Sequence, residues 1–306
     1  MKIKSVAIIG AGAIGSYFIA GLSEKLGENL WVVAEGERKE RLSRQGIIIN
    51  EKQYPLHVKT AAEAHGADLV ILGVKYGALQ EAISYIEKIV DDQTTVMSPL
   101  NGVDSEEIIA SRIGESHMVY SLMKIASQRI ENRIVYNPEV TQGIFFGERD
   151  QRVSERILAI QELFENTEVH YHICKNIEQD IWYKYALNIS KNLPQAILNC
   201  GYGAYSASEH VAYISRKMRQ EVVEIAAAKG IDIRDENNPI AGNATVSPDA
   251  RFSTLQDLDA KRTTEIEMFS GALIRMGKEL GVATPYNEFA YHAIKALEEK
   301  NCGRFN

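Results

Sequence analysis

An apolar strand, a glycine-rich turn and a helix follow one another directly at the start of the chain. Residues Ser5–Ile9 form a short apolar run, which is typical of a strand buried on both faces of a parallel sheet. The turn that follows consists of Gly10, Ala11, Gly12, Ala13, Ile14 and Gly15. Ser16–Leu26 then has the apolar spacing of a helix. This order predicts a Rossmann-type unit, because GxGxxG between a strand and a helix is the dinucleotide-binding fingerprint.

Each glycine of this turn has its own steric role in the prediction. Gly10 permits the tight turn, Gly12 lets a pyrophosphate approach the backbone, and Gly15 lets the helix pack closely on the strand. The helix N-terminus offers N–H groups and a favourable dipole to the phosphates. A glycine turn without a ligand is the alternative, and the strand and helix on either side argue against it. We therefore expect a nicotinamide dinucleotide to bind here.

The residue after the second predicted strand bears on which dinucleotide is used. This strand, Asn29–Ala34, ends at Glu35, 20 residues beyond Gly15. A carboxylate at this place accepts hydrogen bonds from the ribose hydroxyls of NAD(H) and repels the 2′-phosphate of NADP(H). Three basic residues follow closely and could hold that phosphate instead, or form a solvated helix face: Arg38, Lys39 and Arg41. The sequence favours NAD(H) and leaves NADP(H) open.

The alternation of strands and helices continues and predicts a doubly wound sheet. The expected elements are strands at Gly46–Asn50, Leu56–Lys59, Ala67–Val74 and Thr94–Met97 and a helix at Leu79–Ile89. Lys75 and Asn101 follow two of these strands. Ligands of open α/β sheets bind at the carboxyl ends of the strands, so both residues are candidates for cofactor contact.

The remaining chain is expected to complete the sheet and then become entirely helical. Strands are predicted at Val119–Met123, Arg133–Tyr136 and Gly143–Phe146, finishing the sheet in antiparallel fashion, then a helix at Arg152–Glu165 and a last strand at Glu168–Ile173. Helices are predicted at Asp180–Asn199, Ala207–Gly230, Asp257–Gly281 and Thr284–Asn301, with a loop or short helices over Asp235–Ser253. The expected domains are residues 1–171, a Rossmann domain, and 172–306, an all-helical domain.

A polar stripe marks the first of these helices. Lys184, Asn188 and Asn192 recur every four residues, so their side chains leave one face of the helix. Pro194 follows, and it predicts a kink or break after Asn192 because proline has no amide donor. A lysine beside two amides can line a pocket, and an ordinary surface face is the alternative.

Charge and composition exclude several classes of function. The chain of 306 residues carries a formal net charge of −7, which argues against a nucleic-acid partner. The three cysteines are far apart and show no metal-ligand spacing, so free thiols in a reducing cytoplasm are expected and no metal site is predicted. No apolar run of about 18 residues occurs, so no membrane span is expected. The sequence leaves the oligomeric state open, with a homodimer as one of the options.

Taken in order, these motifs resemble those of the ketopantoate reductases (2-dehydropantoate 2-reductases). The resemblance covers nearly the whole chain. The residues that carry it are GAGAIG at 10–15, Val74-Lys75, Asn101-Gly102, the WYK…N…N of 182–192, and the STLQD…RTTEIE block of 253–267. It implies reduction of the ketone of a 2-oxo acid by a nicotinamide cofactor, with ketopantoate as the default substrate.

The resemblance also implies roles for individual residues. Lys184 matches the family's catalytic lysine, which protonates the carbonyl oxygen as hydride arrives, and Glu265 matches the glutamate that contacts the cofactor and orients this lysine. Asn101 matches an asparagine near the nicotinamide ribose and is expected to contact both the cofactor and the substrate. The substrate-binding matches are Asn188, Asn192 and Ser253, the last of which hydrogen-bonds the carboxylate. An ammonium near a developing alkoxide both stabilises its charge and supplies the proton.

Three departures from the family pattern leave alternatives open. Glu35 stands where members that use NADPH have arginine, and the proline of the family's Asn-Pro pair is shifted by one position to Pro194. Tyr202 stands where the family has a further substrate-binding asparagine. Glu35 and Tyr202 favour an NAD-dependent D-2-hydroxyacid dehydrogenase for branched or aromatic 2-oxo acids. A non-catalytic dinucleotide-binding sensor is a third hypothesis, against which the retained Lys184 and Glu265 argue.

Overall fold

The chain folds into two compact units, Met1–Ile177 and Glu178–Asn306. The computed structural model describes residues 2–130, 133–235, 238, 240 and 246–305. The sequence-based boundary after residue 171 falls inside the last strand of the first unit, Tyr171–Ile173. Each unit has buried apolar residues of its own, such as Phe18 and Phe164 in the first and Val222 and Leu273 in the second.

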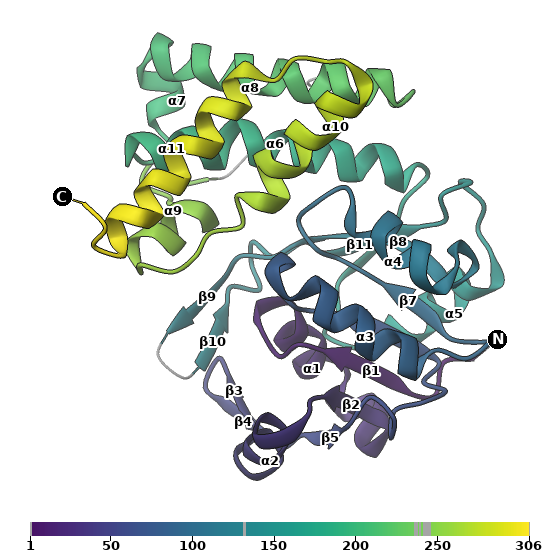
Figure 1. Ribbon diagram of the computed structural model, residues 1–306. Helices are drawn as coiled ribbons and strands as arrows, with labels where there is room; N and C mark the ends of the chain where they lie inside the picture. Colours follow the sequence, from purple (N-terminus) through teal and green to yellow (C-terminus); the bar gives the residue numbers. More distant parts are fainter. Residues whose placement is uncertain (1, 131–132, 236–237, 239, 241–245, 306) are drawn as a thin grey trace. The chain divides into compact units, whose positions relative to one another are not determined.

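An eight-stranded sheet forms the centre of the first unit (Figure 1). In spatial order its strands are β12 (Tyr171–Ile173), β11 (Gly143–Gly147), β8 (Met118–Lys124), β7 (Thr95–Met97), β6 (Leu69–Leu72), β1 (Val6–Ile9), β2 (Leu30–Val33) and β5 (His57–Lys59). Neighbouring strands are parallel except β8 and β11, which are antiparallel. All four residues of β1 are buried, as expected for a strand with helices on both faces of its sheet.

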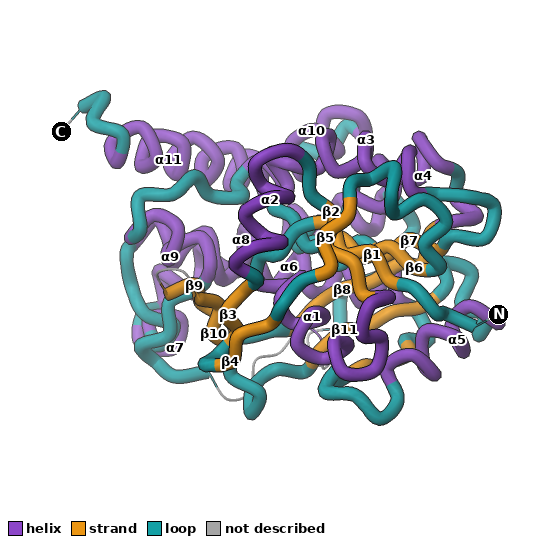
Figure 2. The backbone as a smooth tube through the Cα atoms, turned by 90° about the horizontal axis from the view of Figure 1, so that it is seen from below, coloured by secondary structure: helices purple, strands orange, loops and turns teal. Residues whose placement is uncertain are grey.

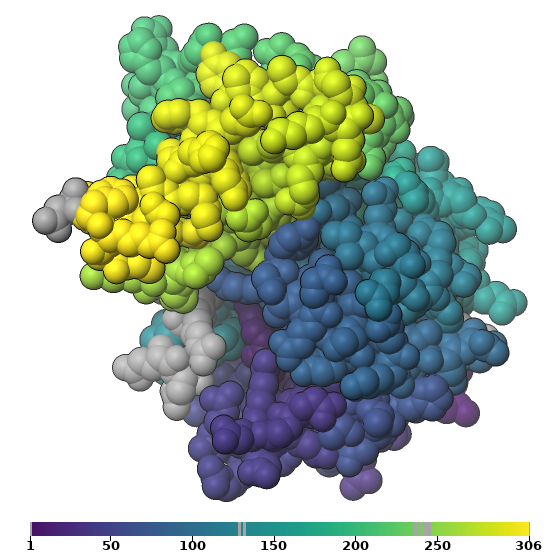
Figure 3. Space-filling model, viewed as in Figure 1, coloured from purple at the N-terminus to yellow at the C-terminus, as the bar shows by residue number. Residues whose placement is uncertain are grey.

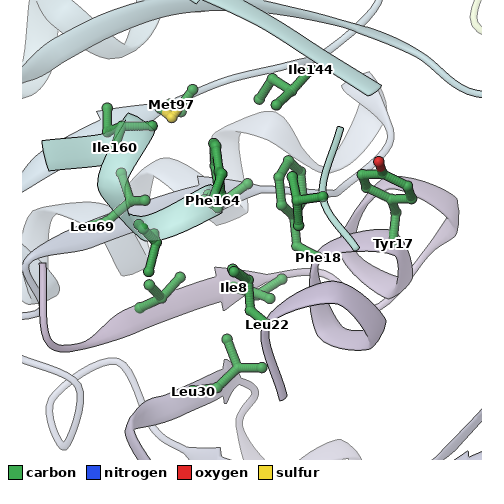
Figure 4. Close-up of a cluster of buried hydrophobic side chains, with 14 of the residues drawn as sticks. Ile8, Tyr17, Phe18, Leu22, Leu30, Leu69, Met97, Ile144, Ile160 and Phe164 are labelled. Atoms are coloured by element: carbon green, nitrogen blue, oxygen red, sulfur yellow. The ribbon is translucent and has the colours of Figure 1, made fainter. Parts of the chain in front are cut away.

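Helices cover both faces of this sheet, which confirms the predicted doubly wound fold. They are α1 (Ala13–Leu26), α2 (Gly36–Gln45), α3 (Leu79–Ile89), α4 (Ser105–Ile113) and α5 (Glu155–Phe164). Figure 2 shows α1 and α5 on one side of the strands and α3 and α4 on the other. The core between α1, α5 and the sheet contains Phe18, Leu22 and Phe164 stacked over Ile8 and Leu69 (Figure 4).

A second, smaller sheet contradicts one prediction. Its strands are β4 (Lys52–Tyr54), β3 (Ile47–Ile49), β10 (Arg133–Tyr136) and β9 (Ser127–Ile130), in this order. The prediction that Arg133–Tyr136 finishes the main sheet is therefore wrong. Asn50 holds β10 here, since its backbone N–H donates to Ile134 O at 2.7 Å and its Oδ1 accepts from Tyr136 N at 3.0 Å. An alternating sequence predicts a strand but does not identify its partner.

The described residues of the second unit form helices joined by loops, with no strand among them, as predicted. Its helices are α6 (Ile177–Leu198), which starts at the last residue of the first unit, α7 (Ala204–Ala207), α8 (Glu209–Ala228), α9 (Ser253–Asp259), α10 (Ala272–Leu280) and α11 (Pro285–Asn301). A π-helical turn, Glu267–Gly271, leads into α10. Asn287 anchors α11 to α8, because Glu221 accepts hydrogen bonds from its backbone N–H and its side-chain amide at 3.0 and 2.7 Å.

Of the kink or break predicted after Asn192, the break does not occur. Helix α6 continues through Pro194 to Leu198. Leu193 and Ala196 on either side of the proline are buried, and the side chain of Gln195 hydrogen-bonds to backbone of residues 250 and 252. Tertiary packing thus maintains the helix where a local rule predicts an interruption.

The prediction of one helix over Asp257–Gly281 is also wrong. Helix α9 ends at Asp259, and Lys261 adopts a left-handed conformation with φ +52°. The backbone N–H and hydroxyl of Thr264 both donate to Glu298 Oε1 at 2.7 Å, which holds the connecting loop against α11. Residues 236, 237, 239 and 241–245 of the loop or short helices expected over Asp235–Ser253 lie outside the described residues, and α9 begins at Ser253.

Candidate functional site

The glycine turn between β1 and α1 leaves no room for side chains at two of its positions. Gly10 has φ +98°, and a Cβ there would lie 2.7 Å from Val74 Cγ1. A Cβ on Gly15 would lie 1.9 Å from the carbonyl oxygen of Gly10. Larger residues would therefore push β1, α1 and the end of β6 apart, and glycine is required for the turn to close.

The N-terminus of α1 is built to receive an anion. Gly12 precedes the helix and provides no side-chain cap, and the first turn contains no acidic residue. Ala11 and Ile14 pack partly buried against the core, while Ala13 begins the helix. A helix terminus with uncapped N–H groups and no local carboxylate fits the pyrophosphate of a dinucleotide.

Gly73 completes this turn and was not singled out in the sequence. A Cβ on Gly73 would lie 2.7 Å from both Gly10 O and Gly15 N. Its own N–H donates to Ile9 O at 2.8 Å, so the end of β6 runs directly beneath the turn. The sequence feature that could have identified Gly73 is its place at the end of an apolar run, just before Val74-Lys75.

Glu35 lies two residues after the end of β2 and immediately before α2. Its Oε1 accepts a hydrogen bond from Ala61 N at 3.0 Å, which fixes the carboxylate at the carboxyl end of the strand. Of the three nearby basic residues, Lys39 forms an ion pair with Glu63. The hydrogen bond from Lys39, followed by weaker contributions from hydrogen bonds of Thr60, lowers the pKa of Glu63 to about 2. Arg38 and Arg41 are exposed on α2, a helix without buried residues that forms part of the purple surface in Figure 3.

Lys75 and Asn101 follow adjacent strands, β6 and β7, at the edge of the sheet that also carries the glycine turn. Lys75 is exposed and precedes the short 3-10 turn Tyr76–Ala78. The Tyr76 hydroxyl donates to Asp104 Oδ2 at 2.7 Å. This bond ties the loop after Lys75 to the loop after Asn101, so the two candidate cofactor contacts are positioned together.

A buried polar chain lies behind the Asn101 loop. Ser98 Oγ donates to Ser105 Oγ at 2.9 Å, and Ser105 Oγ donates to Glu106 Oε2 at 2.7 Å. Burial raises the pKa of Glu106 to about 7, in spite of the hydrogen bond from Ser105 that acts in the opposite direction. The carboxyl group therefore changes its charge near neutral pH.

The polar stripe lies on α6 as predicted by its spacing. Lys184 and Asn192 are 8% and 7% exposed. Asn188, which lies between them in the sequence, is half-buried. Because α6 is continuous here, the three side chains leave the same face of the helix. A buried lysine on a face with two amides is a costly arrangement for stability alone.

Ser253 and Tyr202 lie close to this stripe within the second unit. Asn192 Nδ2 donates to Ser253 Oγ at 3.4 Å. The ring of Tyr202 packs edge-on against Phe252, with centroids 5.4 Å apart, and lies 5.6 Å from the ring of Tyr205. An aromatic cluster thus lies directly beside Ser253, which the family resemblance implies to be a substrate contact.

Glu265 precedes the π-helical turn, and its carbonyl oxygen accepts hydrogen bonds from Met268 N and Phe269 N at 3.0 and 3.2 Å. The hydroxyl of Tyr185, next to Lys184 in the chain, donates to Phe269 O at 2.6 Å. The segment after Glu265 is thereby fastened to α6. π-Helical turns occur frequently at functional sites.

The candidate residues divide between the units. The glycine turn, Glu35, Lys75 and Asn101 lie in the first unit, and the second contains Lys184, Asn188, Asn192, Tyr202, Ser253 and Glu265. Within the described ranges, no three metal-ligating side chains come together, and the cysteines are unbridged. None of the described helices has the length and apolar character to cross a bilayer.

Comparison with models of known families matches both parts of the chain to the same family. Residues 6–151 match the model of ketopantoate reductase PanE/ApbA, and residues 176–298 match that of its C-terminal domain. The chain belongs to the ketopantoate reductase family. This confirms the resemblance drawn from the sequence motifs.

Individual relatives of this family member are distant but span the full length. A 2-dehydropantoate 2-reductase of Archaeoglobus fulgidus is 26% identical, with 97% of this chain and 99% of the relative covered. An Aquifex aeolicus protein of the same name is 25% identical over 95% and 96% of the two chains.

Two solved structures share the fold of this chain. The ketopantoate reductase of Ralstonia eutropha superimposes with a TM-score of 0.80 at 23% identity, covering 97% of this chain and 99% of that one. A D-mandelate dehydrogenase in complex with NADH and anilino(oxo)acetate superimposes with a TM-score of 0.84 at 22% identity and the same coverage.

Proposed function

We propose that this ketopantoate reductase family member transfers hydride from a nicotinamide cofactor to the ketone of a 2-oxo acid, reducing ketopantoate to pantoate. The observation that carries the proposal is the buried Lys184 on the same face of α6 as Asn192, which is hydrogen-bonded to Ser253. This set offers one proton donor and a neutral polar surface for a carboxylate. The relatives named 2-dehydropantoate 2-reductase support the choice of substrate.

In this proposal Lys184 acts as general acid. Its ammonium stabilises the negative charge that develops on the carbonyl oxygen and then donates the proton. Asn188, Asn192 and Ser253 bind the substrate through amide and hydroxyl groups, with Ser253 donating to the carboxylate. Glu265 orients the lysine. A reduced nicotinamide, when bound, supplies the hydride.

The cofactor would be held by the first unit. The uncapped N-terminus of α1 would bind the pyrophosphate through backbone N–H groups of the Gly10–Gly15 turn. Lys75 and Asn101 would contact the nicotinamide half. NADH is the proposed form, because the carboxylate of Glu35 would accept hydrogen bonds from the ribose and repel a 2′-phosphate.

A second candidate keeps the reaction and changes the substrate to a branched or aromatic 2-oxo acid, with the chain acting as an NAD-dependent D-2-hydroxyacid dehydrogenase. The cluster of Tyr202, Tyr205 and Phe252 favours it, because aromatic rings beside Ser253 would form an apolar wall for a bulky side chain. A D-mandelate dehydrogenase, solved in complex with NADH and anilino(oxo)acetate, shares this fold.

Initial rates of cofactor oxidation test both candidates. Ketopantoate, 2-oxoisocaproate and phenylglyoxylate are compared with NADH and NADPH in parallel. Highest kcat/KM with ketopantoate supports the first candidate, and highest kcat/KM with the bulkier acids and NADH supports the second. Absence of turnover with every pair would favour a dinucleotide-binding sensor without catalytic activity.

A homodimer is part of the proposal as well. A ketopantoate reductase of Staphylococcus aureus, which shares this fold with a TM-score of 0.78, is described as dimeric. The molar mass in solution, measured by light scattering, distinguishes a 34.1 kDa monomer from a dimer.

A further inference from the structure

The side chain of Gln195 connects α6 to the segment that precedes Ser253. It is fully buried, with 0% exposure. Its Nε2 donates to Ala250 O at 2.8 Å, and its Oε1 accepts from Phe252 N at 2.6 Å. Both ends of the amide are thus bound to backbone groups just ahead of Ser253, the first residue of α9.

The segment held in this way has no regular secondary structure, so its backbone groups depend on partners from elsewhere. Tyr202 N also donates to Ala250 O at 3.1 Å, and the side chain of Gln256 donates to Arg251 O at 2.6 Å. Gln195 differs from these partners because it lies on α6, the helix that carries Lys184 and Asn192. It therefore ties the position of Ser253 to the polar stripe.

The hydrogen bond between Asn192 and Ser253 depends on where the backbone before Ser253 is held. At 3.4 Å it is near the upper limit for a hydrogen bond, so a displacement of a few tenths of an ångström would break it. Gln195 is too deeply buried to contact a substrate itself, so its effect must pass through the segment that it holds.

We propose that Gln195 is a positioning residue for the substrate carboxylate. It fixes the backbone before Ser253 and thereby places the Ser253 hydroxyl beside Asn192, where both bind the carboxylate of a 2-oxo acid. This inference rests on the proposed function.

The variant Gln195→Met tests the proposal, because methionine has a similar length and forms neither hydrogen bond. We expect KM for the 2-oxo acid to rise at least about tenfold, which corresponds to roughly 1.4 kcal/mol, while KM for the cofactor stays within about twofold. Gln179→Met is the matched control. Gln179 lies at the other end of α6, and its side chain donates to Asp232 O, away from Ser253.

A double-mutant cycle with Ser253→Ala separates positioning from a general structural role. If Gln195 acts through Ser253, Gln195→Met should change KM by less than about twofold in the Ser253→Ala background. A purely structural role would give the same fold-change in both backgrounds. Gln195→Glu serves if the methionine variant does not fold, since it retains the acceptor for Phe252 N and loses the donor to Ala250 O.

The outcomes separate this inference from the proposed function. An unchanged substrate KM in an active Gln195 variant, or an equal loss in the Ser253→Ala background, would overturn the positioning role alone. A wild-type protein that reduces no 2-oxo acid would overturn the proposed function, and the positioning role with it.

Discussion

Asn192 and Ser253, which are 61 positions apart in the chain, meet through a hydrogen bond of 3.4 Å between Nδ2 and Oγ. The contact brings the polar face of α6 to the start of α9. Two neutral groups placed in this way can bind a carboxylate without burying a second charge. The proposed substrate site depends on this pair.

Ser253→Ala should therefore weaken substrate binding. Loss of one hydrogen bond to a charged carboxylate costs about 1.5–3 kcal/mol, so KM for the 2-oxo acid should rise by roughly 10- to 150-fold. KM for the cofactor should not change. Steady-state kinetics measure both values, with Ser111→Ala, an exposed serine on α4, as control. Equal KM values for the 2-oxo acid in the variant and the wild type would show that Ser253 does not bind the substrate.

Glu35→Arg should shift cofactor preference towards NADPH. The change removes a carboxylate that repels the 2′-phosphate and provides a guanidinium that can bind it. We expect the ratio of kcat/KM for NADPH to that for NADH to rise at least about tenfold. Glu37→Arg makes the same charge change two residues later, at an exposed position of α2, and should leave the ratio nearly unaltered. An unchanged ratio in Glu35→Arg would indicate that Arg38 and Arg41, and not Glu35, set the preference between NADH and NADPH.

Glu106→Gln should change how stability depends on pH. Burial raises the pKa of Glu106 to about 7 from an ordinary value of 4.5. The folded state therefore binds more protons than the unfolded state between these values, and the free energy of unfolding falls as pH rises through this range. The full effect is about 3 kcal/mol, present above pH 7 and absent below pH 4.5.

Glutamine has no such titration, so the variant should gain stability relative to wild type between pH 5 and pH 8. Urea unfolding midpoints at the two pH values measure this difference. Glu24→Gln, an exposed position on α1, is the control. Parallel pH profiles for wild type and Glu106→Gln would show that Glu106 titrates at an ordinary pKa.

Glu221→Gln should destabilise the second unit. The buried carboxylate of Glu221 accepts hydrogen bonds from Tyr286 N, Asn287 N and Asn287 Nδ2 at 2.8, 3.0 and 2.7 Å, which anchors the N-terminus of α11 to α8. An amide would direct its own N–H groups at one of these donors and would carry no charge. A loss of about 1–3 kcal/mol in unfolding free energy is expected. Glu224→Gln on the exposed side of α8 should stay within about 0.5 kcal/mol; equal losses in the two variants would refute the anchor.

Features encoded within a few neighbouring residues were predictable from the sequence. The strand, the glycine turn from Gly10 and the helix follow one another directly, although the helix begins at Ala13 and not at Ser16 as predicted, and the helix Leu79–Ile89 has the predicted bounds. The spacing of Lys184, Asn188 and Asn192 likewise needs only the period of a helix. Local patterns of this kind are sufficient for a Rossmann-type sheet and a helical second part.

Features that depend on distant partners were not predictable. β10 pairs with β3, more than 80 residues earlier, and nothing in its own alternation indicates that partner. The loop between α9 and the π-helical turn is held by Glu298, and the helix through Pro194 is maintained by the surrounding packing. The part played by Ser253 came from the family resemblance, and Gln195 became visible only through its contacts.

Lys184→Ala tests the central claim most directly, since the lysine is the proposed proton donor. With the substrate and cofactor that give the wild type its highest rate, kcat should fall at least about 100-fold. The Kd of the cofactor, measured separately by fluorescence, should be unchanged because the glycine turn and Glu35 are intact. A kcat within about twofold of wild type would contradict the assignment of Lys184 as general acid, and the proposed mechanism with it.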